Sequence, residues 1–184
     1  EAAKLVSLQS IEASRSEFSG VALSSPKLMG IVNVTPDSFS DGGKQNTSED
    51  GARLASEGAH ILDVGGESTR PGSDAVPLND ELARVIPVIM QLSAAGHLVS
   101  VDTRKSVVMG EAVKAGAKII NDVSALQYDP DSLRVVAELG IPVVLMHAQG
   151  DPRTMQLNPH YDDVALDVYD YLEARVEACV AAGI

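Results

Sequence analysis

Apolar and polar positions alternate in a regular rhythm from residue 27 onward. Short apolar runs rich in β-branched residues alternate with longer segments of helical period. The runs predict strands over 28–34, 61–65, 98–102, 119–123 and 142–147. The longer segments predict helices over 47–58, 80–95, 105–116, 130–139 and 162–182. Residues 1–26 lack this rhythm and are expected to form an irregular or peripheral lead-in to a domain over 27–184.

The same signal recurs where a predicted helix gives way to the next strand. A glycine lies between the two elements in EGAHILDV, AGHLVSVD, AGAKIIND and LGIPVVLM, and glycine is typical of a left-handed helix C-cap. These units predict a parallel sheet with right-handed crossovers. The chain ends on the same signal, AAGI. Five β/α units cannot close an eight-stranded barrel, and an open doubly wound sheet could also have five strands, so the count alone does not decide between them.

Polar residues gather where the predicted strands end. The strand ends run into VTPDSFSDGG, GGESTRPGSD, DTR, ND and MHAQGDPRTMQ. The opposite connections, from helix to strand, are short Gly- and Ala-containing turns without such polar clusters: EGAH, AAGH, KAGAK and ELGIP. Ligands of parallel α/β folds bind at the carboxyl ends of the strands. Five polar ends favour a barrel mouth over an open sheet, which concentrates its ligand at one switch point.

Four side chains at these ends are candidate ligand groups. Asp63 and Asp102 lie in or at the end of apolar strands, where a carboxylate needs a partner. Each either contacts a ligand or bonds to backbone N–H groups. The amides of Asn33 and Asn121 suit a ring edge or a hard metal ion, and could instead close an Asx turn.

Composition narrows the class of protein. The net charge of −12 and the lack of a basic stripe weigh against a nucleic-acid binder. The longest apolar run is too short to cross a membrane and no signal peptide is visible, so we expect a cytoplasmic domain without a membrane partner. The single cysteine, Cys179, lies on the apolar stripe 172–180 and is expected to be an ordinary buried thiol. His147 lacks a second His or Cys at zinc-ligand spacing.

The motifs GIVNVTPDSFSDGG, DVGGESTRPG, SVDT, IIND and LMHAQGDPRTMQ, in this order from Leu28 to Ile184, resemble dihydropteroate synthase. The resemblance implies a (β/α)8 TIM-barrel fold, of which this chain holds the first five β/α units. It implies a transferase of folate biosynthesis that joins 6-hydroxymethyl-7,8-dihydropterin pyrophosphate to p-aminobenzoate and releases pyrophosphate. It further implies Mg²⁺ as cofactor, inhibition by sulfonamides, and a homodimer for the complete enzyme.

The resemblance also assigns residues to the site. Asn33 matches a residue near Mg²⁺ and the pyrophosphate. The substrate-binding candidates are Asp102, Asn121 and Met146 of the pterin site, Asp37, Ser38 and Phe39 of the first mobile loop, and Thr69, Arg70 and Pro71 of the second, with Asp63 added from its position in the strand. The catalytic candidates are Asp37, Thr69 and Arg70. Asp37 would stabilise a cation-like pterin methylene. Arg70 could alternatively form a structural salt bridge to Glu67.

The resemblance stops short of the family's length. Family members carry three further β/α units with DPGxGFGK, SRK and RxHD segments, and these are not found here. We therefore expect a chain truncated after its fifth unit and inactive by itself. The alternatives are a non-catalytic pterin-binding fragment, one half of a split enzyme, or a pterin-binding methyltransferase module with a related barrel.

Overall fold

The computed structural model describes residues 16–34, 47–68, 72–150 and 153–184, and its centre is a five-stranded sheet. The sheet order is β3-β4-β5-β6-β7 and every neighbouring pair is parallel. The strands are β3 (Met29–Asn33), β4 (Ile61–Gly65), β5 (Val99–Asp102), β6 (Ile119–Asp122) and β7 (Val143–Leu145). All five predicted strands are confirmed, with small differences at their ends.

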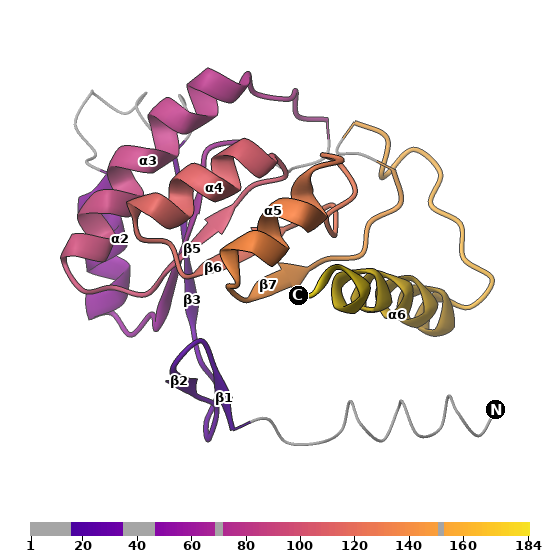
Figure 1. The fold of residues 1–184 in the computed structure, drawn as a ribbon, viewed down its shortest axis with the longest axis horizontal. Helices are drawn as coiled ribbons and strands as arrows, with labels where there is room; N and C mark the ends of the chain where they lie inside the picture. Colours follow the sequence, from indigo (N-terminus) through magenta and orange to yellow (C-terminus); the bar gives the residue numbers. More distant parts are fainter. Residues whose placement is uncertain (1–15, 35–46, 69–71, 151–152) are drawn as a thin grey trace.

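A helix follows each strand, and helices α2 to α5 lie side by side along the sheet (Figure 1). The helices are α2 (Thr47–Ser56), α3 (Leu78–Ala94), α4 (Ser106–Ala115), α5 (Ser132–Leu139) and α6 (Val164–Ala182). Each of the helices α2 to α5 returns the chain to the next position in the sheet, so sheet order equals chain order. A doubly wound sheet would reverse its order at a switch point. Consecutive order is that of a β/α barrel wall.

The hydrophobic core lies between the sheet and these helices. The strands contribute alternate residues, as the period of two requires: Val32, Leu62, Val64, Val99, Val101 and Ile120. The helices contribute Val85, Ile89, Leu92, Val108, Met109 and Ala112. Each fully buried Val or Leu stabilises the fold by about 1.5–3 kcal/mol.

The other face of the sheet carries two rows of aligned residues. One row is Ile31, Asp63, Ser100 and Ile119, and the next row toward the carboxyl ends is Asn33, Gly65, Asp102, Asn121 and Val144. Residues aligned on neighbouring strands point to the same side, so each row is a band of adjacent side chains. This face is open at β3, where Ile31 keeps 68% of its surface exposed.

The helix ends follow the predicted glycine signal, whereas the starts of α3, α5 and α6 each differ by two residues from their predictions. Gly116 and Gly140 close α4 and α5 in the left-handed conformation, with φ of 117° and 62°. The helix predicted over 130–139 begins two residues later, at Ser132. The Asp129 carboxylate accepts the backbone N–H of Asp131 at 3.0 Å through Oδ1, in the turn before α5. Its Oδ2 accepts the backbone N–H of Ser106 at 2.9 Å, so it also caps the neighbouring helix α4.

Helix α6 packs on the sheet less closely than its apolar stripe predicts. Cys179 is 5% exposed, which confirms the buried thiol, and burial raises its pKa. Val176 and Val180 belong to the same predicted stripe, yet they are 52% and 67% exposed. The stripe prediction is therefore wrong for these two valines, because α6 contacts only part of the preceding unit.

Two short elements precede the sheet. Strands β1 (Glu17–Phe18) and β2 (Val21–Ala22) form an antiparallel hairpin, which lies beyond the amino end of β3 (Figure 1). Within the described ranges, no helix is both long and apolar enough to cross a membrane.

Candidate functional site

The candidate site is the polar row at the carboxyl ends of the strands. It aligns Asn33 of β3, Asp102 of β5 and Asn121 of β6, with Gly65 between the first two. A Cβ atom at Gly65 would lie 3.4 Å from Oδ2 of Asp102. The glycine therefore leaves room beside the carboxylate. The expectation that polar strand ends converge is confirmed for these three side chains.

Asp63 supports this row from one position deeper. The Asn121 side-chain amide donates to Oδ2 of Asp63 at 2.9 Å. Asp63 is 6% exposed, and its other oxygen, Oδ1, accepts no hydrogen bond from any described residue. The bond that the structure gives Asp63 comes from a side chain rather than from a backbone N–H group, and ligand contact by Asp63 remains a prediction. The bond also fixes which way the Asn121 amide faces.

Asp102 is the most perturbed group of the row. Its Oδ1 is buried and accepts no hydrogen bond from the residues that the structure describes. Burial, followed by the negative charges of Asp63 and Asp122, raises the pKa of Asp102 to about 7. A buried acceptor without a partner is costly by itself. This arrangement suits a ligand that brings N–H donors to the carboxylate.

Sequence reasoning missed Ser100. Its hydroxyl is 0% exposed and also lacks a hydrogen-bond partner among the described residues. It is aligned with Asp63 and lies two positions before Asp102, on the same face of β5. The signal was present in the sequence as a polar residue inside LVSVD, at the spacing that places it on the Asp102 side.

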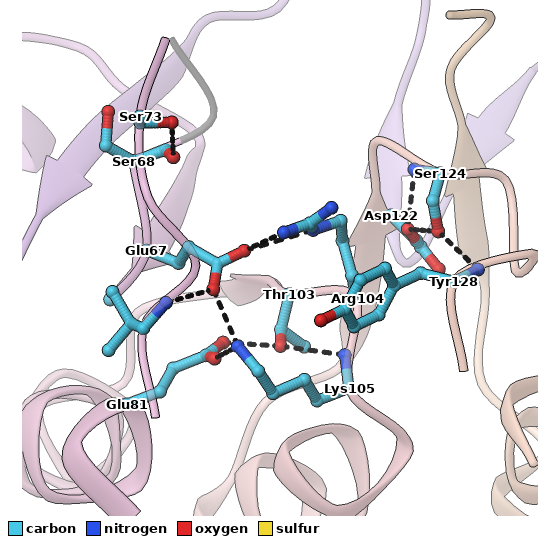
Figure 2. Close-up of polar contacts among 12 residues, drawn as sticks. Glu67, Ser68, Ser73, Glu81, Thr103, Arg104, Lys105, Asp122, Ser124 and Tyr128 are labelled. Carbon is cyan, nitrogen blue, oxygen red and sulfur yellow. Dashed lines mark hydrogen bonds and ion pairs between the residues drawn. The ribbon is translucent and has the colours of Figure 1, made fainter. Parts of the chain in front are cut away.

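A second polar cluster joins the segments that follow β4 and β5, and sequence reasoning also missed it (Figure 2). Glu67, just after β4, pairs with Arg104 and Lys105, which follow β5. Lys105 also pairs with Glu81 of α3. Burial alone would raise the pKa of Glu67, but hydrogen bonds from Lys105 and Arg104 outweigh it and lower that pKa. The same bonds to Glu67 and Glu81 overcome burial at Lys105 and raise its pKa.

Met146 lines a pocket of about 320 Å³. Val123, Tyr128 and Tyr171 also line this pocket. The ring of His147 is in edge contact with that of Tyr171, at 4.8 Å between centroids. The structure thus aligns Asn33, Asp102 and Asn121 in one row and places Met146 at this pocket.

Six of the predicted site residues lie outside the described ranges. They are Asp37, Ser38 and Phe39 of the first predicted loop and Thr69, Arg70 and Pro71 of the second. Their assignments remain predictions. The alternative salt bridge from Arg70 to Glu67 would have to compete with the two cations that Glu67 already binds.

Comparison with known proteins agrees with this geometry. Residues 29–184 match the family described as pterin binding enzyme. The dihydropteroate synthase of Escherichia coli K12 is 50% identical over 167 residues, which cover 88% of this chain and 59% of that protein. The Yersinia pestis dihydropteroate synthase, solved in a sulfonamide drug complex, has a TM-score of 0.83 at 47% identity over 89% of this chain and 61% of that one. The Xanthomonas albilineans enzyme with 4-aminobenzoic acid has a TM-score of 0.81 at 55% identity over 89% and 59%.

These matches settle the fold and the family. The chain spans about 60% of the length of the relatives that it matches. Across that span the sheet and helices superpose on those of the solved relatives, which confirms the predicted barrel fold class. With its polar strand ends, its consecutive parallel sheet and a family match from residue 29 to residue 184, this chain belongs to the pterin binding enzyme family.

Proposed function

We propose that the protein acts in folate biosynthesis as a dihydropteroate synthase. It would condense 6-hydroxymethyl-7,8-dihydropterin pyrophosphate with p-aminobenzoate and release pyrophosphate. The observation that carries this proposal is the row of Asn33, Asp102 and Asn121, with a buried carboxylate oxygen that no described residue bonds. The matching relatives are named dihydropteroate synthases, which favours the synthase over a methyltransferase module.

The row suits the polar edge of a pterin. A pterin presents an amino group and ring N–H groups along one edge, and an ionised carboxylate accepts hydrogen bonds from such donors. Asp102 would take these donors, while the Asn121 amide, held by Asp63, offers a further polar contact. N–H donors stabilise the ionised form, so a bound pterin would lower the raised pKa of Asp102.

The proposed reaction needs no covalent enzyme intermediate. The amine nitrogen of p-aminobenzoate forms a bond to the pterin methylene and loses a proton. The bond from that methylene to the pyrophosphate oxygen breaks, and its electron pair leaves with the pyrophosphate. By the resemblance, Asp37 would stabilise positive charge on the methylene. Thr69 and Arg70 would bind the leaving group.

Mg²⁺ is the cofactor of this proposal, and Asn33 is the residue that would hold it. An amide oxygen is a hard ligand of the kind that Mg²⁺ accepts. Mg²⁺ takes one or two protein ligands and completes its shell with waters and substrate phosphates, so a single amide ligand is compatible with it. Bound Mg²⁺ would supply positive charge to the leaving pyrophosphate.

The direct test is product formation by the protein expressed from its complete reading frame. Dihydropteroate and pyrophosphate should appear in equal amounts when both substrates and Mg²⁺ are present. Asp102→Ala should abolish pterin binding, whereas Asp131→Asn, a change at an exposed carboxylate, should leave turnover unchanged. Pterin binding without turnover by the unmodified protein would support a non-catalytic pterin-binding protein instead.

Three further expectations belong to the same proposal. Sulfonamides should compete with p-aminobenzoate, as the drug-bound Yersinia pestis relative suggests. The complete enzyme should be a homodimer, which light scattering would measure. Its location should be the cytoplasm, which fractionation of the source cells would test.

A further inference from the structure

The two ends of the loop between β4 and α3 are hydrogen-bonded to each other, and we call these ends, residues 67–68 and 73–76, the neck of the loop. The Glu67 carboxylate accepts the backbone N–H of Val76 through Oε2 at 2.8 Å. One step further along, the Ser73 hydroxyl donates to the carbonyl of Ser68 at 2.5 Å. Both contacts join the ascending and descending limbs of the loop (Figure 2). These two hydrogen bonds therefore hold the two limbs of the loop together at its neck.

The same carboxylate ties this neck to the next loop of the site. Arg104 donates to Oε1 of Glu67 through Nε at 3.0 Å and also through Nη2. Lys105 donates to Oε2 at 2.7 Å. Arg104 and Lys105 follow Asp102 by two and three positions. The neck is thus fixed relative to the turn that begins at the candidate pterin-binding carboxylate.

The connection continues to a third loop. The Arg104 guanidinium stacks on the ring of Tyr128, 4.1 Å from its centroid. The Tyr128 backbone N–H donates to the Ser124 hydroxyl at 3.2 Å, and that hydroxyl donates to the buried Asp122 at 2.7 Å. Figure 2 shows the contacts running from Glu67 through Arg104 to Asp122. Arg104 therefore links the loops that follow three consecutive strands.

Only a carboxylate suits the position of Glu67. Every partner that approaches its two oxygens is a donor: one backbone N–H, one ammonium and two guanidinium N–H groups. A glutamine would turn an NH2 group toward donors in either orientation of its amide. The side chain is 5% exposed, so water cannot readily replace a lost partner.

We propose that Glu67 is a positioning residue, which fixes the neck of the β4–α3 loop relative to the turn that follows Asp102. The catalytic part of this inference rests on the proposed synthase function, in which Thr69 and Arg70 of this loop would bind the leaving group. Glu67 acts through Val76, Arg104 and Lys105 and need not touch substrate.

The first test is amide hydrogen exchange in the protein expressed from its complete reading frame. In Glu67→Gln the Val76 N–H should exchange about tenfold faster or more, while the core amide of Val101 keeps its rate. Glu67→Asp, which keeps both charged oxygens, should give an intermediate rate. The matched control is Glu81→Gln. Glu81 belongs to the same cluster, but its carboxylate bonds to Thr103 and Lys105 and not to the neck. It should lower stability without selective exchange at Val76.

The second test separates positioning from folding by kinetics. Glu67→Gln should lower kcat by about tenfold, because misplacing the groups that would bind the leaving pyrophosphate by a fraction of an ångström costs turnover. Affinity for 6-hydroxymethylpterin, measured by calorimetry, should stay within about threefold. Glu67→Asp should recover part of the loss.

Each outcome decides the inference. An unchanged Val76 rate in Glu67→Gln overturns it, and equal acceleration at Val76 and Val101 shows a merely structural role. An equal loss of pterin affinity and of p-aminobenzoate turnover also overturns it. If the unmodified protein makes no dihydropteroate, the proposed function fails, whereas the exchange comparison still decides whether Glu67 holds the neck.

Discussion

The side-chain amide of Asn121 donates a 2.9 Å hydrogen bond to Oδ2 of Asp63, and the bond passes from β6 to β4 across the intervening strand β5. It joins the deeper row of the open sheet face to the row at the carboxyl ends. Asp102 lies on β5, the strand between the two strands that this bond joins. Asp63 thus holds one member of the row and repels the charge of another.

Asp63 therefore has two separable effects, and two substitutions should distinguish them. Asp63→Asn keeps an oxygen that can accept the Asn121 bond but removes the negative charge that raises the pKa of Asp102. The pH midpoint of pterin binding should therefore fall, with little change in maximal affinity. Asp63→Ala removes both effects and should also lower affinity by about tenfold. Calorimetry across pH measures both quantities. The same midpoint in Asp63→Asn as in the unmodified protein would contradict the charge effect.

Asp102 should make stability depend on pH in an unusual direction. Its folded pKa of about 7 lies above the ordinary value of 3.8, so the native state binds more protons than the unfolded state between those pH values. Stability from this group is therefore present at pH 4 and is lost as pH rises through 7. Asp102→Asn should match the unmodified protein near pH 4 and exceed it at pH 8 by as much as about 4 kcal/mol. Urea unfolding at both pH values measures the difference, with Asp131→Asn as the exposed control.

The buried cluster should be sensitive to the loss of one charge. Glu81 is fully buried. The single positive charge of Lys105 forms ion pairs with both Glu81 and Glu67. Lys105→Met should cost about 3–5 kcal/mol, because both carboxylates lose a buried partner. Adding Glu81→Gln to that variant should recover part of the loss. Chemical denaturation of the single and double variants measures the coupling. Additive losses would show that Lys105 and Glu81 do not act as a pair.

Gly66 and Gly110 form a matched pair for a steric prediction. A Cβ at Gly66 would lie 2.7 Å from Cγ1 of the fully buried Val85, so Gly66→Ala should destabilise by about 1–3 kcal/mol. A Cβ at Gly110, inside α4, would meet nothing within 4 Å. Gly110→Ala should therefore stabilise by up to about 1 kcal/mol through helix propensity. Thermal unfolding compares the two. A loss in both variants would indicate a crowded α4 instead.

Much of the fold was predictable because it is encoded locally. Each glycine that ends a helix and each β-branched run that follows it lie within a few residues of one another, and the strands formed where these signals placed them. Asp129 shows where local reasoning fails. One oxygen of its carboxylate accepts the N–H of Asp131 beside its own helix, and the other accepts an N–H at the N-terminus of α4, 23 residues away in sequence. The second bond depends on how two loops pack, which no local pattern specifies.

The site was likewise predictable where it depends on residue types at the strand ends, and not where it depends on pairing between distant segments. The residue types at the strand ends identified Asn33, Asp102 and Asn121, and parallel alignment brought them into one row. The Glu67 cluster was missed because its partners lie 37 and 38 residues away, and their pairing requires the order of the strands. Ser100 was missed although its spacing from Asp102 placed it on the same face.

The identity of sheet order and chain order also bears on how the molecule assembles. Within the described five-stranded sheet, every pair of neighbouring strands is also a pair of neighbours along the chain. Loop closure between these successive partners is therefore short-range. This part of the sheet can form strand by strand in chain order, because each of the helices α3, α4 and α5 packs on the helix before it.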